Sequence, residues 1–230
     1  MQITVDGVVE TLPNGREEYK DAFTTACESM KESLDIVRSP GFDNHSTWKF
    51  DCENEFIKVY YKDMNGLRYF SARVKAPLSC EEGNRRNWEG VVNMPDWNEN
   101  IRYSRILHHL NDHCDITNYA SNKKFTVDSR DFVAARMMKR TDDGRYIISA
   151  KSCQISTVPE DKDAVRGVLH LGMGMFTPDP EDPKSRSIYD YLICMDLCGF
   201  MPKFLMNQVM GKLVLSDIEN YRQNVFSKNG

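Results

Sequence analysis

The sequence predicts an α+β fold, in which a large antiparallel sheet packs against helices. Two observations support this class. Apolar residues recur at helical spacing near each end of the 230-residue chain, over residues 17–37 and 202–226. Between these segments, runs rich in β-branched and aromatic residues follow one another and are joined by short turns, which favours antiparallel pairing.

The first helix is predicted over residues 17–37. Its apolar positions keep the helical period: Tyr19, Ala22, Phe23, Ala26, Met30, Leu34 and Val37. Residues 1–15 are expected to be loosely ordered, so that a single domain covers residues 16–230.

Three strands and a helical insert come next. After a loop over residues 39–46, strands are predicted at 47–52, 55–63 and 67–76, with Asn65-Gly66 in the hairpin turn between the last two. Residues 78–94 predict a helix, and residues 94–101 a turn or short helix.

Six further strands precede the last helix. They are predicted at 102–110, 113–120, 131–140, 145–153, 164–176 and 187–197. The Pro-rich segment 177–185 forms the turn between the final two. The glycines of residues 167–176 alternate with strand residues and indicate a bend in a curved sheet.

The last helix begins near Pro202, which suits a first helical turn. Its apolar stripe is wider than one packing face needs. Two interpretations remain open: a core helix with a generous apolar face, or a lid over an apolar cavity, for which flexible methionines are suited. A strongly curved sheet must pack on another sheet or wrap around another element. The last helix is the large apolar element that remains to cover the concave side of this sheet.

Composition excludes several classes. The net charge of −4 and the absence of a long Lys/Arg run argue against a nucleic-acid partner. The first residues lack the basic start and apolar run of a signal peptide, and no stretch approaches the roughly 18 apolar residues of a membrane span. Seven cysteines at irregular spacings are expected to be reduced thiols in the cytosol.

No motif indicates covalent chemistry or a cofactor. The sequence contains no Gly-x-Ser-x-Gly elbow, Walker loop or dinucleotide fingerprint. Residues 108–114 (HHLNDHC) hold three histidines and a cysteine, but His108 and His109 are adjacent and point to opposite faces of a strand. Solvated residues at a hairpin tip are therefore favoured over a metal site.

Arg136 is the most informative charge. In the strand at 131–140, Phe132, Ala134, Arg136 and Met138 share one face, whereas Val133, Ala135 and Met137 share the other. Both faces are largely apolar, so Arg136 has no evident exposed side. Either it forms a structural ion pair, with Asp115 on the neighbouring strand as the candidate partner, or it holds the polar end of a ligand.

Four motifs in order resemble those of the StAR-related lipid transfer (START) family. They are DWNENI (96–101), SRDFVAAR (129–136), AVRG (164–167) and MDLCGFMPKFLMNQVMGKLVLSDI (195–218), and the resemblance spans about residues 17–226. The match is closest to the sterol-binding branch of the family and its soluble cytosolic members. The implied structure is a helix-grip fold, in which a curved antiparallel sheet wraps around a long C-terminal helix and encloses a lipid tunnel.

The resemblance also implies a binding site. Arg136 would lie in the tunnel, and Arg130 at the strand entry, after a loop at about residues 120–129 that borders the opening. The other implied lipid-binding residues are Asp115, Thr117 and Tyr119 on the preceding strand, Phe132, Ala134 and Met138 beside Arg136, and Leu205, Met206, Val209, Met210 and Leu213 on the lid helix.

Two positions depart from the family pattern. In the sterol branch an acid on the preceding strand faces the tunnel arginine, whereas the matching stretch here offers Thr117, Asn118 or Tyr119, with Asp115 the nearest carboxylate. The phosphatidylcholine-transfer branch has an arginine where this chain has Asn98, which argues against a phosphocholine site.

The resemblance implies a soluble, monomeric, cytoplasmic carrier that is no enzyme and needs no cofactor. It would take up one lipid, with a sterol as the expected ligand, and touch donor and acceptor membranes transiently. Three alternatives remain: a carrier of another lipid such as a phospholipid or fatty acid, a ligand sensor acting through a protein contact, and a helix-grip enzyme. The enzyme would need an acid/base pair, for which Asp115, Tyr119 and His170 are candidates.

Overall fold

The computed structural model describes residues 1–124, 127–199 and 203–227, with backbone only for residues 203–205. The helical elements are η1 (Glu17–Tyr19), α1 (Lys20–Val37), α2 (Cys80–Glu89), η2 (Gly90–Asp96) and α3 (Lys203–Ser227). The strands are β1 (Gln2–Val5), β2 (Val8–Thr11), β3 (Lys49–Glu53), β4 (Lys58–Met64), β5 (Leu67–Ala76), β6 (Ile101–Asn111), β7 (Cys114–Ser121), β8 (Arg130–Arg140), β9 (Tyr146–Ser152), β10 (Val165–Arg166), β11 (Val168–Pro178) and β12 (Ser187–Asp196).

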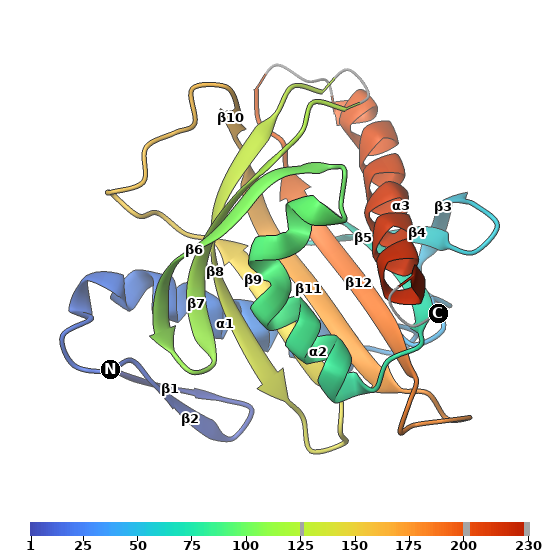
Figure 1. Ribbon diagram of the computed structural model, residues 1–230, viewed down its shortest axis with the longest axis horizontal. Coiled ribbons are helices and arrows are strands. Elements are labelled where there is room, and N and C mark those ends of the chain that lie inside the picture. The colour runs from blue at the N-terminus through green and yellow to red at the C-terminus, as the bar shows by residue number, and fades with distance from the viewer. Residues whose placement is uncertain (125–126, 200–202, 228–230) are drawn as a thin grey trace.

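One large sheet organises the molecule. Its strand order is β3-β4-β5-β12-β11-β9-β8-β7-β6, and neighbours along this path are antiparallel. The short strand β10 pairs with β8 in parallel. The sheet curves around α3, and the predicted α+β class and helix-grip fold are confirmed (Figure 1).

The two faces of the sheet carry separate helices. Figure 1 shows α1 behind the sheet, whereas α2 and α3 lie in front of it. Accordingly the buried apolar residues form two clusters, one between α1 and the sheet and one between α3 and the sheet. Because strand side chains alternate, each central strand contributes to both clusters.

Strand β8 shows this division most clearly. Val133, Ala135 and Met137 belong to the cluster under α1, whereas Phe132 and Ala134 belong to the cluster under α3. The predicted alternation of the two faces of this strand is confirmed. It places Arg136 on the same side as Phe132 and Ala134, facing α2 and α3.

The N-terminal segment differs from the expectation. Residues 1–15 contain a β-hairpin, β1–β2, instead of being loosely ordered. Asp6 and Gly7 form its turn with φ of 51° and 77°, the backbone that a tight two-residue hairpin requires. Val5 and Leu12 are buried in the cluster under α1, which holds the hairpin to the domain.

Two further segments differ in detail. The predicted strand at 164–176 is divided into β10 and β11 around Gly167. A Cβ atom at Gly167 would overlap the ring of Phe132, so glycine lets the chain pass close to that ring. The predicted helix at 78–94 is divided into α2 and the 3₁₀ helix η2, which contains Pro95.

Some predicted features lie at the limits of the described residues. The predicted start of the last helix at Pro202 lies outside them, as does part of the loop at 120–129. The seven cysteines are all free thiols. Within residues 1–124, 127–199 and 203–227, none of the helices combines the length and hydropathy that crossing a bilayer needs.

Candidate functional site

An internal cavity of about 270 Å³ lies between the sheet and the α2, η2 and α3 helices. Its wall is mostly apolar, which is the usual character of small-molecule sites. The sheet contributes side chains from the inward faces of β7, β8, β9, β11 and β12, and α3 closes the opposite side. The curved sheet and the apolar stripe of α3 therefore enclose a space instead of packing fully against each other.

Arg136 on β8 is a charged residue of the cavity wall and is paired with a carboxylate. It lies directly opposite Asp115 on β7. Its Nε donates to Asp115 Oδ1 at 2.8 Å, and its Nη2 donates to Asp115 Oδ2 at 2.6 Å. Arg136 is 6% exposed and Asp115 is fully buried. This two-bond geometry is the strongest form of an arginine–carboxylate pair.

The helix α2 completes the surroundings of Arg136. The Nη2 atom also donates to the Trp88 carbonyl oxygen at 3.3 Å, and the guanidinium lies 4.3 Å from the centre of the Trp88 ring. Because α2 supplies both contacts, the arginine is held between sheet and helix. It lines the cavity with its charge already balanced by Asp115.

Arg130 lies at the other end of β8 and has a different set of partners. Its guanidinium donates to the backbone carbonyl oxygens of Asp128, Leu197 and Cys198. The last two residues follow β12, in the segment that leads to α3. Arg130 lines the cavity and also fixes the chain where it leaves the sheet.

Aromatic rings form much of the wall. Tyr119 on β7 stacks on Phe132 on β8, with ring centres 5.0 Å apart. Tyr189 on β12 packs against Tyr221 on α3 at 4.4 Å, and Trp97 meets Tyr221 edge-on at 6.3 Å. Burial raises the pKa of Tyr119 and Tyr189 above the usual value, so both are neutral phenols at neutral pH.

A second polar group lies beneath α3. Asn98 and Asn100, just before β6, donate to Asp217 Oδ1 at 3.2 and 2.6 Å. Lys124 donates to Ser216 Oγ at 2.8 Å and to Asn100 Oδ1. Burial raises the pKa of Asp217, although the two asparagine bonds and the Lys124 charge act in the opposite direction. Asp217 also lines the cavity.

The structure brings most of the predicted residues together. Eight of them line the cavity: Arg130, Phe132, Ala134, Arg136, Thr117, Tyr119, Met210 and Leu213. Asp115 forms an ion pair with Arg136. It is therefore the acid on the preceding strand that faces the arginine, as in the family pattern. Whether these residues bind a lipid stays a prediction.

The remaining predicted residues lie elsewhere. Met138 is beyond the cavity, and its sulfur accepts a hydrogen bond of 3.0 Å from Asn84 Nδ2 on α2. Val209 is buried in the core under α3, and Met206 packs against that core. The side chain of Leu205 lies outside the described residues.

Several cavity residues were not predicted, above all Asp217, Trp97, Tyr189 and Tyr191. The spacing of Asp217 carries a signal, since it lies four residues after Leu213 and four before Tyr221, within the apolar stripe of the helix. The tyrosines alternate with buried residues on β12, and that period assigns them a common face without indicating a cavity.

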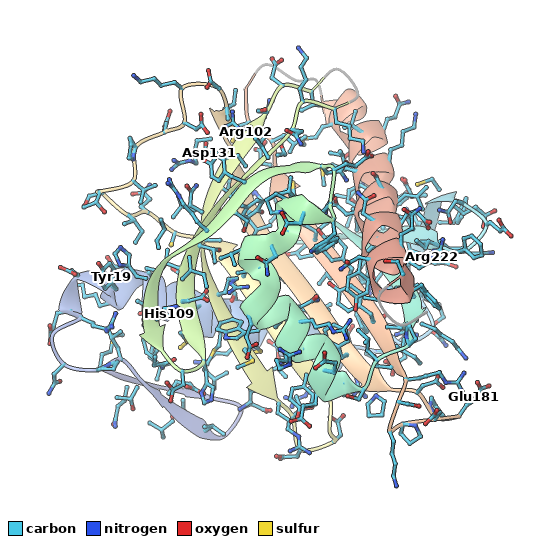
Figure 2. The ribbon with its side chains drawn as sticks, viewed as in Figure 1. Tyr19, Arg102, His109, Asp131, Glu181 and Arg222 are labelled. Carbon is cyan, nitrogen blue, oxygen red and sulfur yellow. The ribbon has the colours of Figure 1, made fainter. Side chains whose placement is uncertain are left out.

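The residues considered for catalysis and metal binding are dispersed. His170 on β11 does not line the cavity, and Asp115 is occupied by Arg136. The side chains of His108 and Tyr19 are in contact where β6 meets η1, near the labels of Tyr19 and His109 in Figure 2. Across the described part of the chain, no three His, Cys, Asp or Glu side chains come together as metal ligands.

Sequence comparisons agree with this arrangement. The family model described as "START domain" matches residues 31–225. Steroidogenic acute regulatory-like protein 1 of Caenorhabditis elegans is 30% identical over 224 residues, which cover 96% of this chain and 86% of that protein. The steroidogenic acute regulatory protein of Xenopus laevis is 26% identical over 208 residues, covering 88% and 70% respectively.

Solved structures show the same fold. Human StAR-related lipid transfer protein 5 superposes with a TM-score of 0.79 at 16% identity, covering 92% of this chain and all (100%) of that one. A STAR-related lipid transfer protein fragment from Xanthomonas axonopodis gives a TM-score of 0.65 at 19% identity, covering 77% and 98%.

Proposed function

The chain belongs to the START domain family, and on that premise we propose that it binds one lipid in the cavity under α3 and carries it between membranes. The observation that carries the proposal is the largely apolar cavity between the sheet and α3. A lipid chain or ring system removed from water there gains roughly 2.5 kcal/mol for each 100 Å² of apolar surface buried.

The expected ligand is a sterol. A sterol presents a hydroxyl group on a rigid apolar body, and the cavity offers a strongly polar point at the Arg136–Asp115 pair beside an apolar and aromatic wall. A hydroxyl can accept from the guanidinium or donate to the carboxylate. The steroidogenic acute regulatory protein names of the relatives support the same class.

Loading requires α3 to move. The cavity of about 270 Å³ lies just below the roughly 300–1,000 Å³ typical of small-molecule sites, and α3 covers it. Exchange of a lipid therefore proceeds through displacement of α3, together with the loop at about residues 120–129, while the sheet and α1 stay in place.

The carrier is proposed to act as a monomer in the cytoplasm, with transient contacts to donor and acceptor membranes. The seven free thiols suit a reducing compartment. The proposed chemistry is binding and release, in which the polar groups of the cavity recognise the lipid.

The test is native mass spectrometry of the purified chain, before and after incubation with phosphatidylcholine vesicles that contain cholesterol. We expect a complex of one protein with one sterol. Capture of a phospholipid or fatty acid would keep lipid carriage and replace the ligand, whereas failure to bind any lipid would contradict the proposal.

A further inference from the structure

The cavity contains a second polar region that the Arg136–Asp115 pair does not account for. The carboxylate of Asp217 and the side chains of Tyr119, Tyr191 and Tyr221 all line it. These residues come from α3, β7 and β12, so three separate elements bring polar atoms to one space. An acid and three phenols on an otherwise apolar wall must be satisfied by one another, by water or by a bound molecule.

The tyrosine hydroxyls lack hydrogen-bond partners among the described residues. Tyr221 is 5% exposed, and its buried hydroxyl has none there. The hydroxyls of Tyr119 and Tyr191 likewise have none within the described part of the chain. In the same part of the chain, the two hydrogen bonds that Asp217 receives both go to Oδ1, so Oδ2 can accept from another donor.

These groups face the same cavity. Asp217, Tyr119, Tyr191 and Tyr221 all line its volume of about 270 Å³. Tyr221 follows Asp217 by one helical turn, on the same face of α3. Burial, to which the Asp217 charge adds, raises the pKa of Tyr119 and of Tyr191, in agreement with this placement.

This region is separate from the Arg136–Asp115 pair along β7. Tyr119, its member on β7, is four residues from Asp115, which corresponds to roughly 13 Å at about 3.3 Å per residue. Asp217 is held by Asn100, which precedes Ile101, and Ile101 pairs with Ser121, two residues further along β7.

We propose that the cavity holds a second ligand-binding site, in which Asp217 and the hydroxyls of Tyr119, Tyr191 and Tyr221 bind a hydroxyl group on the end of the lipid remote from Arg136. This inference rests on the proposed function and refines it. The ligand class is a sterol that carries hydroxyl groups at both ends, such as one oxidised on its side chain. A hydrocarbon tail would offer no partner to the three hydroxyls or to Asp217 Oδ2, whereas a hydroxylated tail can form a hydrogen bond with them.

The experiment compares two probes on the intact chain: cholesterol, and a cholesterol derivative hydroxylated at the end of its side chain, each delivered from phosphatidylcholine vesicles in equilibrium competition. We expect the hydroxylated sterol to bind at least about tenfold more tightly, the value of one hydrogen bond to a charged group. Tyr191→Phe and Asp217→Asn should each lower the affinity for the hydroxylated sterol more than the affinity for cholesterol.

Tyr60→Phe is the matched control. Tyr60 stacks on His45 at 4.5 Å, away from the cavity, so this variant should keep the full preference. Equal affinity of the wild type for both sterols would overturn the second site and leave sterol carriage intact. An equal loss for both sterols in Asp217→Asn would mean that Asp217 only holds α3, and would also overturn it. Binding of neither sterol would overturn both proposals.

Discussion

Asp115 and Arg136 face each other across β7 and β8 and share two hydrogen bonds of 2.6 and 2.8 Å at the wall of the cavity. The pair is almost completely removed from bulk water. It is a structural ion pair, and we propose that it also contacts the ligand through Arg136, which lines the cavity. The two roles can be separated because the charges can be removed together or one at a time.

Removing only one charge should destabilise the fold. Arg136→Leu leaves Asp115 charged and buried, which is expected to cost about 3–5 kcal/mol, whereas replacing both residues by leucine should cost little. We expect the double variant to melt near the wild type and yet to bind cholesterol at least tenfold more weakly. Thermal unfolding and sterol competition measure the two effects.

The exposed pair Arg68–Asp63 is the control for that comparison. Its distance is 2.8 Å, but Asp63 is 52% exposed, so replacing both residues should change stability by less than about 1 kcal/mol and leave binding unchanged. If the Asp115→Leu/Arg136→Leu variant binds sterol as tightly as the wild type, the pair has a structural role alone.

Gly211 sets how closely α3 approaches β3. A Cβ atom at this position would overlap the carboxylate of Asp51. Because the Asp51 carboxylate can rotate away and alanine is the better helix former, we expect Gly211→Ala to change the free energy of unfolding by less than about 1 kcal/mol. Gly211→Leu, which cannot be accommodated by rotating Asp51 alone, should lower it by about 1–3 kcal/mol. Urea denaturation measures both changes, and a large loss in Gly211→Ala would contradict the expectation.

Asp190 on β12 should make stability depend on pH. It is fully buried on the sheet face opposite the cavity, where Arg73 Nε donates to Oδ1 at 2.6 Å. Burial, opposed by Arg73, raises its pKa to about 6 from an ordinary value of 3.8. The folded protein binds the proton more tightly than the unfolded chain, so stability rises as the pH falls from about 6 to 3.8.

The pH effect is measured against Asp190→Asn. The wild type should gain on the order of 2–3 kcal/mol relative to this variant across that window in urea denaturation. Asp63→Asn is the control of opposite sign, because the hydrogen bond from Arg68 lowers the pKa of Asp63 and its contribution is lost on acidification. Parallel profiles for wild type and Asp190→Asn would contradict the expectation.

The movement of α3 predicts a pattern of amide exchange. On vesicles containing cholesterol, the amides of α3 should exchange faster than in solution, because lipid entry displaces this helix from the cavity. The amides of α1, on the other face of the sheet, should be unchanged and serve as the internal reference. Sterol transfer with unchanged protection of α3 would exclude this route.

Local patterns in the sequence were sufficient for most of the fold. The alternation along β8 predicted that Phe132, Ala134 and Arg136 share a face, and the resemblance to the START family predicted that this face lines the cavity. The Asn65-Gly66 turn predicted the β4–β5 hairpin, where both residues have positive φ (52° and 79°). The same signal was present at Asp6-Gly7 and would have predicted the N-terminal hairpin.

The parts of the site that were missed depend on contacts between distant segments. Asp217 meets Asn100 across 117 positions of the sequence, and no local period relates them. Strand register is also a property of the folded sheet: it selects Asp115, and excludes Thr117 and Tyr119, as the residue opposite Arg136. Both relations require the tertiary structure.

The sheet has a separate core on each of its two sides, and this separation affects which amino-acid substitutions the protein can accept during evolution. Substitutions among the cavity residues beneath α3 alter what is carried, whereas the core beneath α1 continues to specify the sheet. Ligand preference can therefore diverge among descendants of one ancestral chain without each step having to rebuild the fold. The face of the sheet under α1 is expected to tolerate fewer replacements.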